Sequence, residues 1–306
     1  MIGCPIARRG SKHFRVVAVR GVALLVLAAS AGAQATSGDP ARGKALVALA
    51  GGCGCHDTKD GPVGAGGRRL PTPFGAFFST NITPDRETGI GDWTDEEIIA
   101  AIREGYVRGK GVEAPVMPYY AYAGMSDRDV RDVVAYLRAL PPVRRENQPH
   151  QVDLPFARLA FRVWRFLFTS PPSPPAEAPA AGLERGRYLA QHVAICGDCH
   201  TPRDRFGVSL ADMYLAGTEH GPFGKAVPNI TPDQKTGIAD WDADDIAHLL
   251  ASGQKPDFDN VQGLMAEVID GYGDGLGYAD APGADLEAVA AYLKSINPIE
   301  HQVKRD

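Results

Sequence analysis

The sequence predicts an all-α protein made of two tandem copies of one small domain. One set of short motifs occurs twice, at offsets of 143 to 156 residues, and apolar residues recur at helical spacing without alternating runs that would indicate a sheet. The length of 306 residues suits two domains of about 100 to 150 residues each. A repeat of this length indicates a duplicated domain rather than a solenoid of short units.

The duplication can be followed along the whole chain. Three matched pairs are Arg42-Gly43 with Arg185-Gly186 at an offset of 143, Asn81–Asp85 with Asn229–Asp233 at 148, and Ala135–Leu137 with Ala291–Leu293 at 156. The increase from 148 to 156 places a gain of eight residues in the second half, after Met265. The two halves are therefore related copies with a local insertion.

The second half contains Cys196-Gly197-Asp198-Cys199-His200, which has the Cys-x-x-Cys-His pattern of a c-type haem attachment site. Two thiols on one helical turn can add to the two vinyl groups of a haem, while the imidazole of the next residue binds the iron. The alternative is a redox or zinc Cys-x-x-Cys that happens to precede a histidine. We favour haem because a version of the motif occurs in each half.

The first half carries Cys53-Gly54-Cys55-His56, which has one spacer residue fewer. Cysteines two positions apart on a helix point about 200° apart instead of sharing a face. Two thioether bonds therefore require the backbone to distort at Gly51, Gly52 and Gly54. We expect covalently bound haem c at both sites, with attachment through Cys55 alone as the alternative at the first.

Methionines recur in register and are the candidates for the second axial ligand. Met117 matches Met265 at the 148 offset, whereas Met125 falls on a glycine and is the alternative in the first half. A methionine in a loop is more often a gap-filler than a ligand, but the shared offset favours ligation. We expect His56 with Met117 and His200 with Met265, because a thioether opposite histidine closes the iron and favours electron transfer.

Several helices are predicted from capping signals and apolar spacing. They cover Pro40–Leu49, Thr94 to about Glu104, Ser126 to about Leu140, Leu183–Val193, a segment that begins at Asp242, and Asp285–Ser295. Thr94 with Glu97 and Asp242 with Asp245 are expected to form capping boxes. Helices are thus expected to run into each Cys/His motif and to follow each methionine.

Residues 1–35 have the features of a secretory signal peptide. Five basic residues precede the apolar stretch Gly21–Ala31, and Ala33-Gln34-Ala35 offers a cleavage site. The alternative is an uncleaved anchor, although the apolar stretch is short for a membrane span. The rest of the chain holds 27 basic and 37 acidic residues, a net charge of −10, which argues against a nucleic-acid partner. We expect a periplasmic protein.

The remainder divides into a first haem domain at 36–143, a linker at 144–182 and a second haem domain at 183–306. Pro171–Pro179 predicts a semi-rigid spacer. Before it, 154–169 predicts a helix with a basic stripe and a wide apolar face. We favour a connector buried between the two domains, whose arginines pair with haem propionates, over a helix that lies on a membrane surface or clasps a partner.

Several longer sequence motifs indicate a family resemblance over residues 38 to 298. They are Gly66-Gly67-Arg68, Thr72–Gly75, the block that begins Asn-Ile-Thr-Pro-Asp and its repeat, Met117-Pro118-Tyr119, and Met265–Val268. With these motifs the chain resembles the dihaem c-type cytochromes that serve as cytochrome subunits of bacterial membrane-bound alcohol, aldehyde and gluconate dehydrogenases.

The resemblance implies an electron carrier with no catalytic residues, in the periplasm or at the inner membrane. Its donor would be a periplasmic or membrane-bound dehydrogenase, and its acceptor a quinone, an oxidase or another cytochrome of the respiratory chain. Such subunits commonly carry three haems, whereas this sequence holds two Cys/His motifs. The alternative is a dihaem redox enzyme, of the peroxidase or thiosulfate-oxidising type, that uses the irregular first site.

Overall fold

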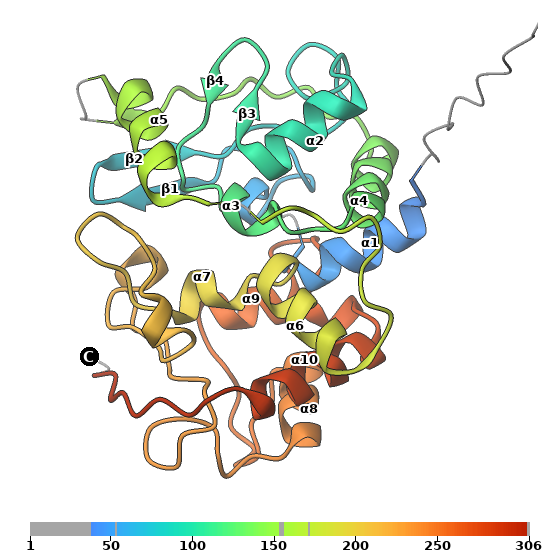
Figure 1. Ribbon diagram of the computed structural model, residues 1–306. Helices are drawn as coiled ribbons and strands as arrows, with labels where there is room; N and C mark the ends of the chain where they lie inside the picture. Colours follow the sequence, from blue (N-terminus) through green and yellow to red (C-terminus); the bar gives the residue numbers. More distant parts are fainter. Residues whose placement is uncertain (1–37, 53, 153–155, 171, 305–306) are drawn as a thin grey trace, which may run out of the picture. The chain divides into compact units, whose positions relative to one another are not determined.

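The computed structural model describes residues 38–52, 54–152, 156–170 and 172–304. The predicted signal peptide at 1–35 and Cys53 lie outside the described residues. The helices of the first half are α1 (Pro40–Leu49), the 3₁₀ turn η1 (Gly54–His56), α2 (Asp95–Glu104), α3 (Tyr119–Tyr122) and α4 (Asp127–Ala139). Helix α5 (Ala157–Phe168) follows in the stretch predicted as the linker. The protein is therefore rich in helix, as predicted (Figure 1).

The second half repeats much of this order. Its helices are α6 (Gly182–His192), α7 (Cys196–His200), α8 (Ala243–Ser252), α9 (Leu264–Asp270) and α10 (Gly283–Ser295), with 3₁₀ turns η2 (Ala211–Met213), η3 (Pro222–Gly224) and η4 (Tyr278–Asp280). The bounds agree with the predicted helices to within two residues at each predicted end, except that α5 begins at Ala157 whereas a helix was predicted over 154–169. The predicted capping boxes at Thr94 and Asp242 are present, and Ser126 accepts a hydrogen bond from the backbone of Asp129.

One close helix contact occurs in both halves. Helix α1 packs on α4, and α6 packs on α10. A Cβ added to Gly43 would lie 1.9 Å from the carbonyl oxygen of Asp132, and one added to Gly186 would lie 1.9 Å from that of Ala288. Because no side chain fits in that space, a glycine is required at each crossing, which explains the recurring Arg-Gly pair.

Short antiparallel strands are also present, so the prediction of an all-α fold was wrong in this respect. Strands β1 (Arg69–Thr72), β2 (Gly75–Phe78) and β5 (Gln151–Val152) form one sheet in the order β1-β2-β5, while β3 (Tyr106–Val107) pairs with β4 (Gly111–Val112). Strands of two to four residues are too short to show the alternation by which a strand is recognised in a sequence.

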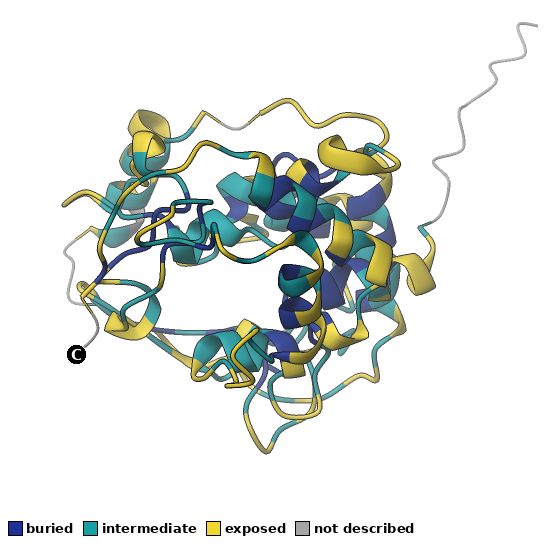
Figure 2. Cartoon of the chain, turned by 90° about the horizontal axis from the view of Figure 1, so that it is seen from below, coloured by how far each residue is buried: buried dark blue, intermediate teal, exposed yellow. Residues whose placement is uncertain are grey.

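The larger hydrophobic core is shared between the halves. Leu46, Leu49 and Met125 of the first half lie in one cluster with residues of α6, α8 and α10, among them Leu189 and Leu250. A smaller cluster belongs to the first half and is centred on α2, α4 and the end of α1. Figure 2 shows the buried positions gathered where the helices meet, with much of the loop surface exposed.

Helix α5 differs from the predicted buried connector. One side packs on both halves: Phe161 lies 6.0 Å from Phe77, and Phe168 stacks on Phe206 with their centroids 5.7 Å apart. The other side is exposed, with Phe166 at 85%. The expectation of burial was therefore wrong for this second side. Within the described part of the chain, no helix has the length and apolar character needed to cross a bilayer.

Candidate haem centres

The second Cys/His motif lies on the single helical turn α7, directly after α6. Ile195 adopts the left-handed region at φ 45°, which is unusual for a β-branched residue and turns the chain into α7. Cys196, Cys199 and His200 are all half-buried. Burial raises the pKa of the Cys196 thiol to about 11, and burial followed by the charge of Asp198 raises the pKa of Cys199 to about 12. Both thiols are therefore neutral near neutral pH.

The first motif follows α1 as the second follows α6, but through a different backbone conformation. Gly51 and Gly52 both adopt the left-handed region, at φ 73° and 70°, and the 3₁₀ turn η1 then carries Cys55 and His56. Two of the three glycines named for this distortion thus adopt it, whereas Gly54 belongs to the 3₁₀ turn. Cys55 is exposed, and desolvation by the neighbouring protein atoms is the main cause that raises its pKa.

The two histidines are oriented by equivalent hydrogen bonds. His56 Nδ1 lies 2.7 Å from the carbonyl oxygen of Thr80, and His200 Nδ1 lies 2.9 Å from that of Pro228. Thr80 and Pro228 are separated by the repeat offset of 148. Burial lowers the pKa of both imidazoles, so each is neutral, donates from Nδ1 and keeps the lone pair on Nε2.

This arrangement fits the ligation of an iron. A metal-binding histidine commonly donates its second ring N–H to a carbonyl, which fixes the tautomer and the orientation of the ring. Both histidines do so here, each next to a thiol that is half-buried or exposed. The residues present therefore suit a covalently attached haem on each half.

The three candidate methionines differ in burial and in position. Met265, on α9, is half-buried and packs against the same core cluster as Cys196. Met117 is half-buried just before α3, and Met125 is only 3% exposed within the shared core. Cys196 and Met265 thus pack against the cluster to which Met125 belongs, whereas Met117 is not among the residues of that cluster.

The two attachment motifs also lie near each other, which the sequence did not indicate. Burial is the main cause that raises the pKa of Cys55 and of Cys199. The charge of Asp198 also contributes to the raised pKa of Cys55, and the charge of Cys55 contributes to that of Cys199. Such effects act over short distances in a protein interior.

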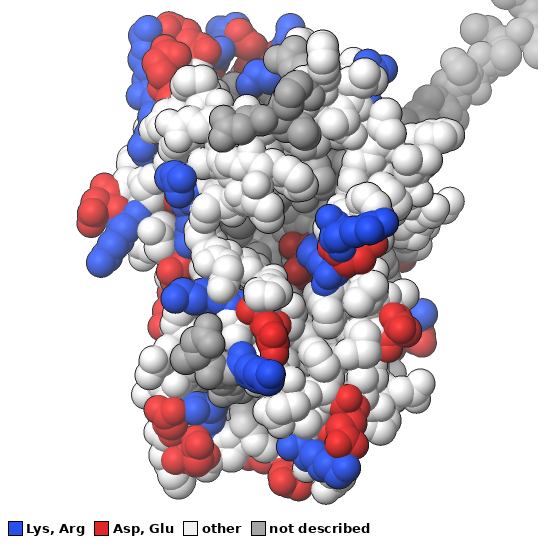
Figure 3. All heavy atoms as spheres, turned by 90° about the vertical axis from the view of Figure 1, so that its left-hand side faces the viewer, with Lys and Arg blue, Asp and Glu red and all other residues white. Residues whose placement is uncertain are grey.

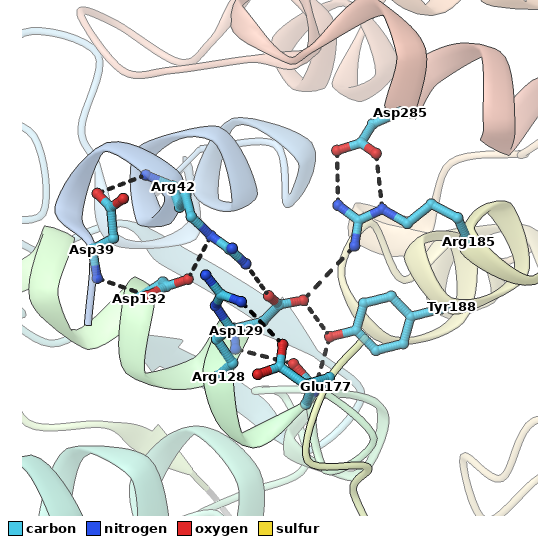
Figure 4. A network of polar contacts seen from close by, with 10 residues as sticks. Asp39, Arg42, Arg128, Asp129, Asp132, Glu177, Arg185, Tyr188 and Asp285 are labelled. Atoms are coloured by element: carbon cyan, nitrogen blue, oxygen red, sulfur yellow. Dashed lines mark hydrogen bonds and ion pairs between the residues drawn. The ribbon is translucent and has the colours of Figure 1, made fainter. Parts of the chain in front are cut away.

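A polar network around the buried Asp129 joins the halves (Figure 4). Arg42 pairs with Asp129 at 3.1 Å, and the equivalent Arg185 pairs with Asp285 at 2.8 Å. Across the halves, the Tyr188 hydroxyl donates to Asp129 at 2.7 Å, and Arg185 lies 3.9 Å from the same carboxylate. Since Asp129 is fully buried, the halves are held together by a charged group that water cannot reach.

A helical fold with one Cys/His motif and one aligned histidine in each half is typical of a protein that binds haem through thioethers. A cytochrome c family model matches residues 40–141. A protein of Cereibacter sphaeroides named "Diheme cytochrome c-type" is 36% identical over 300 residues, which cover 92% of this chain and 98% of that protein. The chain belongs to the c-type cytochrome family.

Two further relatives are subunits of larger enzymes. The gluconate 2-dehydrogenase cytochrome c subunit of Pantoea cypripedii is 35% identical over 89% of this chain and 63% of its own length. The fructose dehydrogenase cytochrome subunit of Gluconobacter japonicus is 32% identical over 93% of this chain and 60% of its own length. The resemblance to dehydrogenase cytochromes is confirmed, and the chain is an electron-transfer cytochrome that spans about 60% of these subunits.

Proposed function

We propose that this chain is a periplasmic dihaem cytochrome c that carries electrons from a dehydrogenase to the respiratory chain. The observation that carries the proposal is the pair of equivalent histidine bonds, His56 to Thr80 and His200 to Pro228. Two irons held alike suit successive one-electron steps, which are the chemistry that haem supplies when bound. The protein's part is to fix the ligands and exclude water.

The ligand set follows from the two motifs. Cys196 and Cys199 attach the second haem, and Cys55, with or without Cys53, attaches the first. His56 and Met117 are the axial ligands of the first iron, and His200 and Met265 are those of the second. Met265 is half-buried beside the core against which Cys196 also packs, and it matches Met117 at the repeat offset, which supports this assignment in the second half.

Met117 is preferred to Met125 in the first half for a physical reason. Met125 fills the core shared by α1, α6 and α10, so moving its sulfur to an iron would leave a cavity there. Met117 is half-buried in a loop and matches Met265 at the repeat offset. It can approach an iron without disturbing the core.

The haem domains are proposed at 36–143 and 183–306, with the linker at 144–182. The contacts of α1 with α4 and of α6 with α10, each closed over a glycine, support two copies of one domain. The shared core and the Asp129 network support a fixed arrangement of the copies rather than two free modules.

The partners are proposed from the relatives, whose names identify them as subunits of gluconate and fructose dehydrogenases. A dehydrogenase is therefore the proposed donor, and a quinone, oxidase or another cytochrome is the acceptor. The predicted signal peptide at 1–35 supports a periplasmic location for this exchange.

Helix α5 is proposed as a peripheral contact with the inner membrane. Its exposed side carries Phe156, Leu159, Phe166 and Leu167, and Arg162 is exposed on the same helix. The side of the molecule on which α5 lies shows broad areas free of charged side chains (Figure 3). Apolar groups beside arginine suit an anionic lipid surface. A Phe166→Ser/Leu167→Ser variant should bind anionic phospholipid vesicles more weakly than wild type, and equal binding would remove this contact.

The function as a whole is tested on mature protein from cells able to mature cytochromes c. Mass spectrometry should show two haem increments, and an optical potentiometric titration should resolve two centres that both show iron–methionine absorption in the ferric state. Met117→His and Met265→His should each remove one of these two absorptions. A colourless protein, or one haem increment, would overturn the dihaem carrier.

A further inference from the structure

Each half contributes its methionine segment to the attachment motif of the other half. The segment with Met265 contacts the first motif through Arg68, and the segment with Met117 contacts the second motif through Tyr120. These contacts are separate from the Asp129 network and lie on the side of the two Cys/His motifs. They give two polar bridges that cross between the halves in opposite directions.

Arg68 forms the first bridge. It donates from Nη1 to the carbonyl oxygen of Gly54 at 2.7 Å, inside the first motif, and from Nη2 to Glu267 at 2.6 Å, two residues after Met265. Its guanidinium lies over the ring of Tyr272 at 3.9 Å, and its side chain is only 13% exposed. The arginine is thus held on three sides, and any shift of α9 has to break a charge-assisted bond.

Tyr120 forms the second bridge. Its hydroxyl donates to Asp198 at 2.5 Å, and Asp198 is the second of the two residues between the cysteines of the second motif. Arg203 pairs with Asp198 and donates to the Tyr120 hydroxyl at 3.1 Å. Tyr120 is three residues after Met117, so the loop that holds this methionine is anchored on the opposite haem site.

The stretch in which the second half gained eight residues packs beside the Arg68 bridge. The gain lies between Met265 and α10, and this stretch packs on the first motif. A Cβ on Gly52 would lie 2.0 Å from the carbonyl oxygen of Leu276, and one on Gly51 would lie 3.3 Å from Val268. The shortened motif is therefore covered by the segment that the other half gained.

We propose that Arg68 and Tyr120 are positioning residues that act across the halves. Arg68 holds Met265 at the second centre, and Tyr120 holds Met117 at the first. The proposal rests on the His/Met ligation of the proposed function. It follows that the strength of the iron–methionine bond at each centre depends on the attachment motif of the other centre.

The first test compares Arg68→Met and Glu267→Gln with wild-type mature protein. The readout is the affinity of the ferric second centre for imidazole, which competes with the methionine and is assigned with Met265→His. Both variants should bind imidazole about tenfold more tightly, as expected from the loss of one charge-assisted hydrogen bond. Arg69→Met is the matched control, because Arg69 is the adjacent exposed arginine, and should keep wild-type affinity.

The two variants also separate positioning from a simple charge effect. Arg68→Met removes a positive charge and Glu267→Gln removes a negative one, so charge alone shifts the reduction potential in opposite directions. Loss of positioning raises imidazole affinity in both. Opposite shifts in imidazole affinity, or unchanged affinity, would overturn the role of Arg68.

The second test compares Tyr120→Phe with Tyr119→Phe. Tyr119 is the neighbour of Tyr120, and its buried hydroxyl has no hydrogen-bond partner among the described residues, so its loss breaks no bridge. Tyr120→Phe should raise imidazole affinity at the first centre about fivefold, and Tyr119→Phe should leave it unchanged. Equal affinities in the two variants would overturn the role of Tyr120.

The outcome for wild-type protein keeps the two proposals apart. If wild type lacks an iron–methionine absorption, the ligand set of the proposed function is wrong. If wild type shows both absorptions and all variants match it, the ligand set holds and the positioning roles are wrong. Haem content and circular dichroism of each variant identify any protein that has failed to fold.

Discussion

The two attachment motifs reach equivalent histidine positions through different backbones. The second uses one left-handed residue, Ile195, followed by the α-turn of α7, whereas the first uses two left-handed glycines and a 3₁₀ turn. Both histidines nevertheless point Nδ1 at a carbonyl at the same repeat position. The orientation of the histidine is therefore the same in both halves although the spacing of the cysteines differs.

The surroundings of the motifs differ in a matching way. The first motif packs against the stretch in which the second half gained eight residues, where Leu276 faces Gly52, while the second motif is contacted by Tyr120 of the short helix α3. A 3₁₀ turn has weaker hydrogen-bond geometry than an α-turn and is usually short. The shortened motif therefore depends more on contacts from the other half than the regular one does.

The largest expected effect concerns the cysteines of the first motif. Cys55 precedes His56 in one tight turn, as Cys199 precedes His200, so Cys55 should be able to carry the first haem. Cys55→Ala should lose one haem increment by mass spectrometry, whereas Cys53→Ala should keep two. Loss of an increment in Cys53→Ala would show that the two motifs attach haem in the same way.

Removal of a buried charge should give the next largest effect. Asp129 is buried and accepts from Arg42 and Tyr188, whereas Asp285 is less buried and pairs with Arg185. Asp129→Asn should lower the free energy of unfolding by about 3 kcal/mol, and Asp285→Asn by about 1 kcal/mol. Urea unfolding of the haem-loaded proteins measures both, and equal losses would contradict the central place given to Asp129.

A smaller effect on stability is expected at the left-handed positions before each motif, which are occupied by different residues. Gly52 and Ile195 both adopt the left-handed region, but only Gly52 faces a carbonyl oxygen that a Cβ would approach to 2.0 Å. Gly52→Ala should cost about 2 kcal/mol of stability, and Ile195→Ala about 1 kcal/mol through lost apolar contact. A cost for Ile195→Ala above that for Gly52→Ala would mean that the first motif is not packed against Leu276.

Local features of this fold could be predicted from the sequence, and contacts between distant residues could not. The helix starts at Thr94, Ser126 and Asp242 were predicted because a cap and its partner lie three residues apart. The bond between Arg68 and Glu267 joins residues 199 positions apart, and one sequence carries no signal for such a pair. The repeat indicated equivalent residues in the two halves but not how one half packs on the other.

The short strands and the exposed side of α5 show two further limits. The β1–β2 hairpin closes through Thr72 and Gly75, a turn too local to separate from a loop in a glycine-rich chain. For α5, the amphipathic pattern was read correctly, but a pattern cannot say what covers its apolar side. The methionine ligands stay a prediction, since their roles depend on where a haem lies between the two halves, which neither the sequence nor the protein atoms fix.

The smallest expected effect is a difference in acid sensitivity between the halves. His192 in α6 stands where the first half has the buried Leu49, and its Nδ1 lies 3.0 Å from the carbonyl oxygen of Ala121 across the halves. Burial lowers the pKa of His192 below its ordinary value of 6.5. As the pH falls through 6.5, this imidazole takes up a proton in the unfolded chain but not in the folded chain. The neutral His192 therefore contributes its full stability above about pH 6.5, and this contribution is lost as the pH decreases.

Replacing this imidazole should weaken the pH dependence without abolishing it, because burial also lowers the pKa of His150. His56 and His200 do not contribute when they are bound to iron. Thermal unfolding of haem-loaded His192→Gln should lose less stability than wild type between about pH 7.5 and about pH 5. Equal losses of stability in the variant and in wild type would mean that His192 accepts a proton in the folded protein. The contact of α6 with α3 would then tolerate a charge, unlike the site of the apolar Leu49 in the first half.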